Sequence, residues 1–192
     1  YQKSLVEKNE KEQKTLLNIS KNKEAEYQKL LQERQAQASK IRSALFNLRG
    51  AGPIPFGDAY EYAKEAGART GVRPAYILAI LKQESNLGAN VGTCNRPGDA
   101  RTWKDIMPGP TSGSWRDDQT AFLRITKRLG ISPEGQPLSC PLAWGGWGGA
   151  MGPSQFIPVT WESYAPRIES ILGVSVANPW NPRHAITATS LY

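Results

Sequence analysis

The sequence predicts a mostly helical protein in which a long N-terminal helix precedes a compact helical domain. Two features of its 192 residues lead to this prediction. All 14 prolines, all six tryptophans and 17 of the 18 glycines lie at residue 51 or later, so the preceding segment lacks helix breakers up to Arg49. The remainder shows helical spacing of apolar residues and no convincing alternating strand pattern. At about 140 residues, it is long enough to bury a core of its own.

Residues 1–49 are expected to form one helix with a coiled-coil seam. The seam advances in steps of four and three residues, as heptads do, through Tyr27, Leu31, Arg34, Ala38, Ile41, Leu45 and Leu48. Such a stripe requires a covering surface, which leaves open another subunit, another region of the full protein or the helical domain itself. Residues 50–57 are rich in glycine and proline and are expected to be a linker to a domain over residues 58–192.

Prolines, glycines and capping residues predict the helices of this domain. They indicate helices over residues 58–69, 74–85, about 115–129, 158–172 and from 182 onward. The helix over residues 74–85 is apolar on most sides and is expected to be central. Ser114 is expected to cap the third helix. Residues 87–114 lack periodicity and are expected to form a long loop of the kind that carries function.

The net charge of +7 is concentrated at the N-terminus, where residues 1–50 contain 11 basic and 6 acidic residues. A basic helix suits anionic cell-wall polymers, anionic lipid or nucleic acid, although a solvated helix surface is the plainer explanation. No aromatic or motif pattern of nucleic-acid binding accompanies it, so no nucleic-acid partner is expected. No apolar stretch approaches the roughly 20 residues of a membrane-spanning helix.

Few residues suggest metal or thiol chemistry, so no metal and no cofactor is expected. His184 is the only histidine, lacks companion ligands and is expected on the surface. Cys94 and Cys140 lack metal-site spacing and lie in polar, loop-like stretches. In an exported protein they would form one bridge between two loops; two free thiols are the alternative.

Glu84 is the first candidate catalytic residue. It follows an apolar helical run, with Leu81 and Ile80 one turn earlier. The end of a helix dipole and apolar surroundings both favour the protonated carboxyl group, as a general acid requires. A surface glutamate at a frayed helix end is the plainer interpretation of this segment alone.

A glycine-rich segment about 65 residues later strengthens the catalytic interpretation. It reads Trp-Gly-Gly-Trp-Gly-Gly-Ala-Met-Gly-Pro-Ser-Gln-Phe from Trp144 to Phe156. Its backbone can approach a ligand closely, and Gln155 offers donors and an acceptor to sugar hydroxyls or an N-acetyl group. Trp144, Trp147 and Phe156 offer flat apolar faces that suit sugar rings. Alone, the segment is equally compatible with a tight turn packed on a core.

Taken together, Glu-Ser-x-x-Gly at Glu84 and Gly-Ala-Met-Gly-Pro-x-Gln-Phe-x-Pro-x-x-Trp ending at Trp161 resemble lytic transglycosylases with a lysozyme-like fold. The likeness covers roughly residues 58–192 and is closest to the membrane-bound lytic transglycosylase B type, with a looser similarity to the soluble lytic transglycosylases. It implies a lysozyme-like helical domain that acts on peptidoglycan glycan strands. It also implies an exported protein of the cell envelope or extracellular space. A targeting segment is expected outside this sequence, because the chain begins with Tyr1 rather than Met.

The resemblance implies one catalytic carboxyl group, Glu84, that performs both proton transfers. It cleaves the bond between N-acetylmuramic acid and N-acetylglucosamine and closes a 1,6-anhydro ring on the muramic acid. Substrate contacts are implied for Ser85, Met151, Gln155, Phe156 and Trp147. No clear second carboxylate motif is present, although Asp99, Asp105, Asp117 and Asp118 remain candidates for one.

The sequence departs from the family pattern in three places. Gly146 stands where the family has a serine that orients the glutamate, which leaves Ser139, Ser154 or a water as substitutes. An acidic loop of the B type is missing after the motif, and the tyrosine element that completes the family's site is expected beyond Tyr192. A hydrolytic muramidase and a non-catalytic peptidoglycan-binding scaffold are the alternative functions. The coil is similar in composition to murein hydrolase activators, which suggests a protein partner or self-association.

Overall fold

The computed structural model describes residues 21, 23–31, 33–34 and 53–192, which fall into two units treated separately below. The described residues of the first unit are helical and exposed, Tyr27 and Leu31 of the predicted seam among them. Most of the predicted seam lies outside the described residues. The coiled coil and its partner therefore stay predictions.

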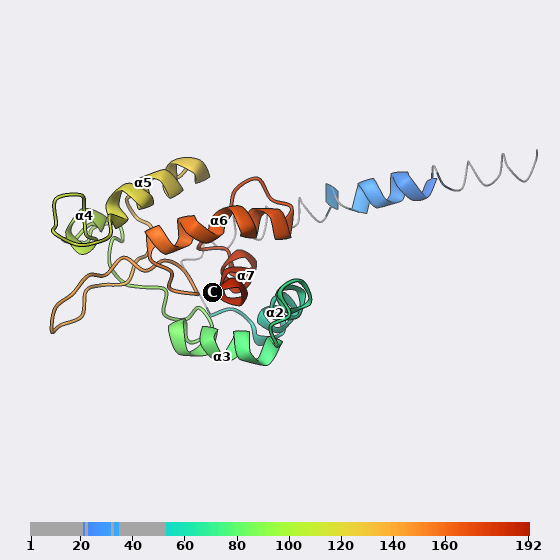
Figure 1. The fold of residues 1–192 in the computed structure, drawn as a ribbon, viewed down its shortest axis with the longest axis horizontal. Helices are drawn as coiled ribbons and strands as arrows, with labels where there is room; N and C mark the ends of the chain where they lie inside the picture. Colours follow the sequence, from blue (N-terminus) through green and yellow to red (C-terminus); the bar gives the residue numbers. More distant parts are fainter. Residues whose placement is uncertain (1–20, 22, 32, 35–52) are drawn as a thin grey trace, which may run out of the picture. The chain divides into compact units, whose positions relative to one another are not determined.

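The second unit consists of helices joined by loops, as Figure 1 shows. The helices are α2 (Phe56–Thr70), α3 (Pro74–Ser85), α4 (Trp103–Ile106), α5 (Asp118–Leu129), α6 (Pro158–Leu172) and α7 (Pro182–Leu191). The part of the chain that the structure describes contains isolated β-bridges but no strand. The prediction of a mostly helical domain is thus confirmed. Within the same part, no helix is long and apolar enough to cross a membrane.

Prolines and glycines set most helix ends where the sequence indicated. α3, α6 and α7 each begin with a proline, and left-handed glycines end α2, α5 and α6. The start of α5 was placed too early, because Asp117 rather than Ser114 is its cap and accepts a hydrogen bond from the backbone N–H of Thr120 at 3.0 Å. The expected loop also contains α4, which Thr102 and Asp105 hold by a reciprocal capping box.

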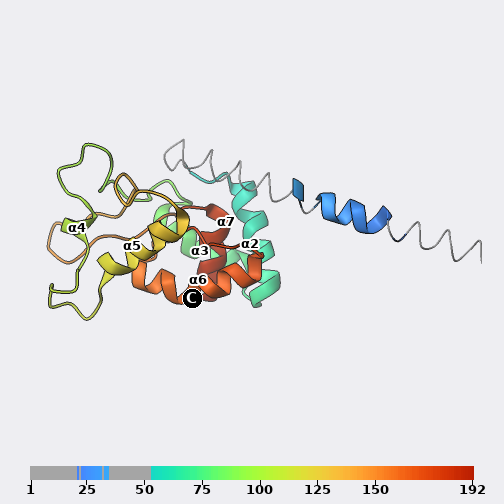
Figure 2. The same cartoon turned by 90° about the horizontal axis from the view of Figure 1, so that it is seen from above.

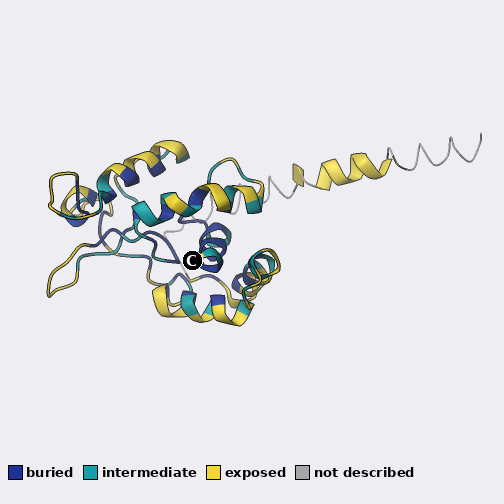
Figure 3. Cartoon of the chain, in the orientation of Figure 1, coloured by how far each residue is buried: buried dark blue, intermediate teal, exposed yellow. Residues whose placement is uncertain are grey.

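The central helix is α7, and the expectation that the helix over residues 74–85 is central is wrong. α7 packs against α2, α3 and α6, and it is buried along nearly its whole length (Figure 3). α3 has one buried face, formed by Ile77, Leu81 and Ser85, while Tyr76 is 60% exposed. Small side chains such as Ala185 in α7 let neighbouring helices approach from several sides, which apolar content alone does not reveal.

Two apolar clusters form the core of the second unit. The larger one joins the loop-rich part of the chain between α3 and α6 to the helices α5 and α6. It contains Trp103, Phe122 and Trp161 among others. The smaller one joins α2, α3 and α7 and contains Ile54 and Ile186. Because Ile54 is buried in it, the packing of this unit begins ahead of the domain start expected at residue 58.

His184 is buried, so its expected surface position is wrong. Its Nδ1 accepts a hydrogen bond from the backbone N–H of Asn178 at 2.9 Å, and burial lowers the pKa of its imidazole to about 4. Trp103 and Trp180 pack in the core, whereas Trp115 is 87% exposed.

Candidate active site

The glycine-rich segment is held by a short ladder of backbone bridges. Leu138 pairs with Cys94 on one side and with Met151 on the other, and Met151 pairs in turn with Phe156. The backbone N–H of Cys94 donates to Leu138 O at 3.0 Å, and that of Met151 donates to Phe156 O at 2.9 Å. The turn from Met151 to Phe156 is therefore fixed by its own backbone to the segment at Leu138, which is fixed in turn to the loop at Cys94.

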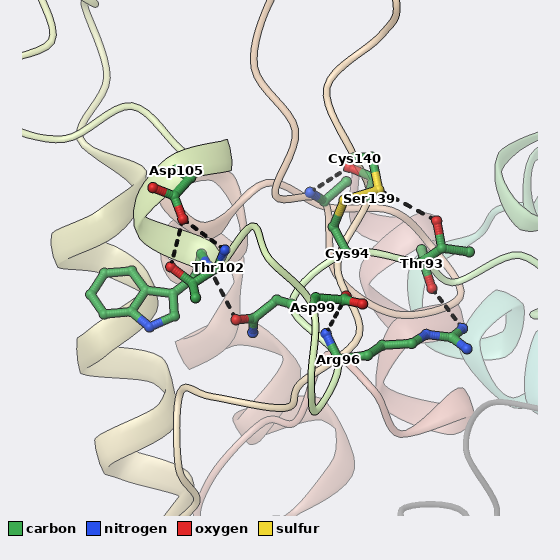
Figure 4. Close-up of a disulfide and its surroundings, with 12 residues drawn as sticks. Thr93, Cys94, Arg96, Asp99, Thr102, Asp105, Ser139 and Cys140 are labelled. Atoms are coloured by element: carbon green, nitrogen blue, oxygen red, sulfur yellow. Dashed lines mark hydrogen bonds between the residues drawn. A yellow bond between two sulfur atoms is a disulfide. The ribbon is translucent and has the colours of Figure 1, made fainter.

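A disulfide ties the same loops together. Cys94 and Cys140 are bonded, with their Cα atoms 5.2 Å apart, as the sequence suggested for an exported protein (Figure 4). Next to it, the side-chain amide of Asn95 donates to Pro133 O at 2.8 Å and to Gln136 O at 3.0 Å. The loop over residues 92–95 is thereby joined to the segment that leads into the glycine-rich turn.

Two glycines of the turn are required by close packing. A β-carbon at Gly149 would lie 2.5 Å from Met107 Cγ, and one at Gly152 would lie 2.0 Å from Pro179 O. Both residues also have positive φ angles, 93° and 61°. Since side chains essentially never approach so closely, these positions admit only glycine without rearrangement. The turn is pressed against the rest of the unit on these sides.

Glu84 lies in the last turn of α3, and its side chain is exposed. Leu81, one turn earlier, faces the core. The carboxyl group is thus not enclosed by the apolar side chains that the sequence pattern indicated. Its position at the C-terminal end of the helix does agree with the sequence.

The chain turns sharply after Glu84. Asn86, Leu87 and Gly88 all have positive φ angles, at 53°, 56° and 79°. Ser85 is buried, and its hydroxyl accepts a hydrogen bond from the backbone N–H of Gly88 at 2.8 Å. The side chain of Ser85 therefore shapes the turn that follows Glu84.

This turn lies beside the glycine-rich turn. A β-carbon at Gly88 would lie 3.6 Å from Pro153 Cγ and 3.1 Å from Ile54 Cγ1. Ser154 donates a hydrogen bond to Ala185 O of α7 at 2.8 Å, and α3 packs against the same helix. The two segments that the sequence singled out are brought together on α7.

Gln155 is the partly accessible polar side chain of the glycine-rich turn. Its φ angle is 50°, and its Nε2 donates to Gly152 O at 2.7 Å. In the part of the chain that the structure describes, its Oε1 has no hydrogen-bond partner. One face of the amide thus holds the turn and the other can accept from a ligand. Met151 and Phe156 are buried, so the contacts expected of their side chains, like that of Ser85, stay predictions.

Aromatic side chains that sequence reasoning missed lie against Phe156. The rings of Tyr164 and Tyr192 are 6.1 Å and 5.6 Å from it, and Tyr192 is 83% exposed. The tyrosine element was expected only beyond this position. The spacing of Trp161 and Tyr164 on one face of α6 was the signal available for part of this cluster.

Neither serine suggested as a substitute for the family's orienting serine bonds to Glu84. The hydroxyl of Ser139 accepts a hydrogen bond from the backbone N–H of Ala150 at 2.9 Å (Figure 4), and Ser154 is committed to α7. Gly146 itself has a φ angle of 98° in open space. Within the described residues, no hydrogen bond or ion pair holds the side chain of Glu84.

The four aspartates considered as a second acid all have structural partners. Asp99 accepts from the backbone N–H of Arg96 at 2.7 Å, while Asp105 and Asp117 cap helices. Hydrogen bonds from Thr102 lower the pKa of Asp105. Asp118 is buried between α5 and α6, and burial raises its pKa even though Arg116 lies 2.8 Å away. Its Oδ1 accepts from the backbone N–H of Val159 at 3.3 Å.

The described residues contain no group of three side chains placed to hold a metal ion. The arrangement is instead one exposed carboxyl group at a helix end, followed by a turn that lies against a rigid glycine-rich turn with an accessible amide. A carboxyl group in such a position can donate or accept a proton.

Comparison with known proteins identifies the family. Residues 54–186 match the family model of the transglycosylase SLT domain, which is more than half of the chain. The chain therefore belongs to the transglycosylase SLT family. The predicted resemblance to lytic transglycosylases is confirmed at the level of this domain. No curated protein matches the chain.

Several solved structures are similar to the chain. The soluble lytic transglycosylase SltB1 from Pseudomonas aeruginosa shares 23% identity over 68% of this chain and 40% of its own, with a TM-score of 0.48. The Escherichia coli lytic transglycosylase Slt35, in a complex with calcium, shares 22% identity over 68% of this chain and 38% of its own, with a TM-score of 0.46. The chain thus spans about two fifths of the length of these proteins.

Proposed function

We propose that this chain cleaves peptidoglycan glycan strands without adding water. The observation that carries the proposal is the placement of Glu84, exposed at the end of α3, beside the glycine-rich turn of a transglycosylase SLT domain. The bond cleaved is the β-1,4 link from N-acetylmuramic acid to N-acetylglucosamine. Gln155 and the side chain of Trp147, which is 45% exposed, would contact the sugars.

Glu84 would act first as an acid and then as a base. Its proton passes to the glycosidic oxygen as the bond to C1 of the muramic acid breaks. The resulting carboxylate accepts the proton of the C6 hydroxyl of the same sugar, whose oxygen attacks C1 and closes the 1,6-anhydro ring. Glu84 ends protonated and no water is consumed, so one carboxyl group suffices. A sugar chain seated over the turn would exclude water from this exposed group.

The finer assignments are proposals as well. The motif from Gly149 to Trp161 favours the membrane-bound lytic transglycosylase B type. The disulfide favours an exported protein of the cell envelope or extracellular space, because such bonds persist in oxidising compartments. The N-terminal helix would serve a protein partner or self-association. A nucleic-acid partner and a cofactor form no part of the proposal.

Digestion of purified peptidoglycan tests the reaction. We expect the wild-type chain to release anhydromuropeptides, each lighter by one water than a hydrolysis product, and Glu84→Gln to release none. Glu61→Gln is the matched control, since Glu61 is an exposed glutamate of α2 paired with Lys64. Products with a free reducing end would indicate a hydrolytic muramidase. Equal activity of Glu84→Gln would exclude Glu84 as the acid, and binding without turnover would indicate a scaffold.

A further inference from the structure

A hairpin over residues 139–150, called here the Trp144 hairpin, leads directly into the glycine-rich turn. The backbone N–H of Ser139 donates to Ala150 O at 2.9 Å, and that of Gly149 donates to Ser139 O at 2.8 Å. The next pair along the two arms is the bridge between Leu138 and Met151. The hairpin is thus a continuation of the backbone that would bind the sugars next to Glu84.

The base of the hairpin is rigid. Its first arm carries Cys140 of the disulfide, and the backbone N–H of Gly148 on its second arm donates to Ile106 O of α4 at 2.8 Å. A β-carbon at Gly148 would lie 2.3 Å from Ser139 O, so the two arms are in close contact. A rigid base lowers the conformational entropy that the tip loses on binding.

The tip of the hairpin presents apolar surface to solvent. Trp144 is 84% exposed and Leu142 is 57% exposed. A β-carbon at Gly145 or Gly146 would meet no atom within 4 Å, so the backbone beside the indole is open. The sequence contains no charged residue between Glu134 and Glu162. The tip can therefore offer a flat, uncharged face together with accessible backbone groups.

We infer that the tip of the Trp144 hairpin, at Trp144, is a further sugar-binding subsite beyond the contacts proposed for Gln155 and Trp147, and that it holds a peptidoglycan glycan strand away from the bond that Glu84 cleaves. The indole would stack on the apolar face of a sugar ring, and the open backbone at Gly145 would permit its close approach. This inference rests on the proposed function. Continuity of the hairpin with the glycine-rich turn favours a glycan over a lipid surface, the other partner that attracts exposed indoles.

Binding to insoluble peptidoglycan sacculi tests the subsite without turnover. In the Glu84→Gln chain, we expect the added change Trp144→Ala to weaken co-sedimentation with sacculi by about tenfold. The matched control is Trp115→Ala, because Trp115 is 87% exposed but lies outside the hairpin, before α5. We expect this control to stay within about twofold of the parent, as loss of an isolated exposed side chain should. Figures 1 and 2 show the loop that precedes α5 and the hairpin as separate protrusions at the same end of this unit.

Strand length separates the subsite from the catalytic site. In the otherwise wild-type chain, Trp144→Ala should lower kcat/KM on long glycan strands by about the same factor, and leave kcat/KM on oligosaccharides too short to reach the tip unchanged. An equal loss on both substrates would overturn the inference. So would unchanged affinity of the Trp144→Ala variant for sacculi, or tryptophan-dependent binding to phosphatidylcholine vesicles in place of sacculi. Failure of the parent Glu84→Gln chain itself to bind sacculi would overturn the proposed function and this inference with it.

Discussion

At the scale of single residues, the turn after Glu84 shows how strain is kept at the candidate site. Leu87 has a φ angle of 56°, a conformation that costs a residue with a side chain about 1 kcal/mol or more. Two contacts hold it there: its backbone O accepts from Ile54 N at 2.7 Å, and Ser85 holds Gly88 from the other side. The fixed turn sets where α3 ends, directly after Glu84 and Ser85.

His184 gives the stability of the protein a pH dependence. Its pKa is lowered to about 4 in the fold from 6.5 when exposed, so the unfolded chain binds more protons between these values. The contribution of His184 to the free energy of unfolding is fully present above pH 6.5. It decreases as the pH is lowered toward 4, and the decrease is about 2–3 kcal/mol at pH 4.5. We expect His184→Asn, which keeps an acceptor for Asn178, to lose this component. Urea unfolding of both proteins at pH 7.5 and 4.5 measures it, and identical pH dependence would contradict the assignment.

Asp118 and Asp105 should give opposite trends. Burial raises the pKa of Asp118, so its charged form is disfavoured in the fold and its contribution declines as pH rises through the raised pKa. Hydrogen bonds lower the pKa of Asp105, so its contribution is present at neutral pH and declines as the pH falls. Relative to wild type, Asp118→Asn should thus gain stability as the pH rises above 4. Asp105→Asn should be less stable than wild type at neutral pH, and this difference should shrink as the pH falls below 4. Chemical unfolding from pH 3 to 7 decides, and parallel profiles for the two variants would refute the prediction.

At the scale of elements, the helices and the bridged loops have different origins. Pro74, Pro158 and Pro182 start helices by local geometry, which is why the sequence could predict these boundaries. The ladder through Leu138 and Met151 joins segments far apart in the chain, and no alternating pattern accompanies it. Such pairings are long-range, so only the fold discloses them.

The disulfide is expected to stabilise this loop-rich half. Its cysteines are 46 residues apart, and closing a loop of this length in the unfolded chain corresponds to about 4 kcal/mol. We expect the double variant Cys94→Ser/Cys140→Ser to lose a stability of this order, and dithiothreitol to destabilise the wild type but not the variant. Thermal unfolding with and without the reductant measures both effects. Equal response of the two proteins to dithiothreitol would show that the bond contributes nothing.

At the scale of the whole molecule, the sequence predicts the class of fold better than the burial of individual residues. Glu84 and the glycine-rich turn stand out as candidates in the sequence because their chemistry is local to short motifs. The sequence did not predict the exposure of Glu84, the burial of His184 or the central place of α7, because each depends on which helices pack together. A helix of alanine, threonine and serine reads as weakly apolar, yet small side chains are what a crowded centre requires.

The position of α7 predicts that the two core clusters of the second unit unfold together. Ile186 of α7 belongs to the smaller cluster and Ala188, two residues later, belongs to the larger one. Ile186→Ala should cost about 2–5 kcal/mol, as a large-to-small change in a packed core does. The same loss of stability should be measured by tryptophan fluorescence, although the buried tryptophans Trp103, Trp161 and Trp180 lie in the larger cluster and not in the one that contains Ile186. Coincident urea transitions by fluorescence and by far-ultraviolet circular dichroism are expected, because a helix shared by both clusters cannot leave one and stay in the other. A fluorescence midpoint unchanged from wild type would mean that the clusters are independent.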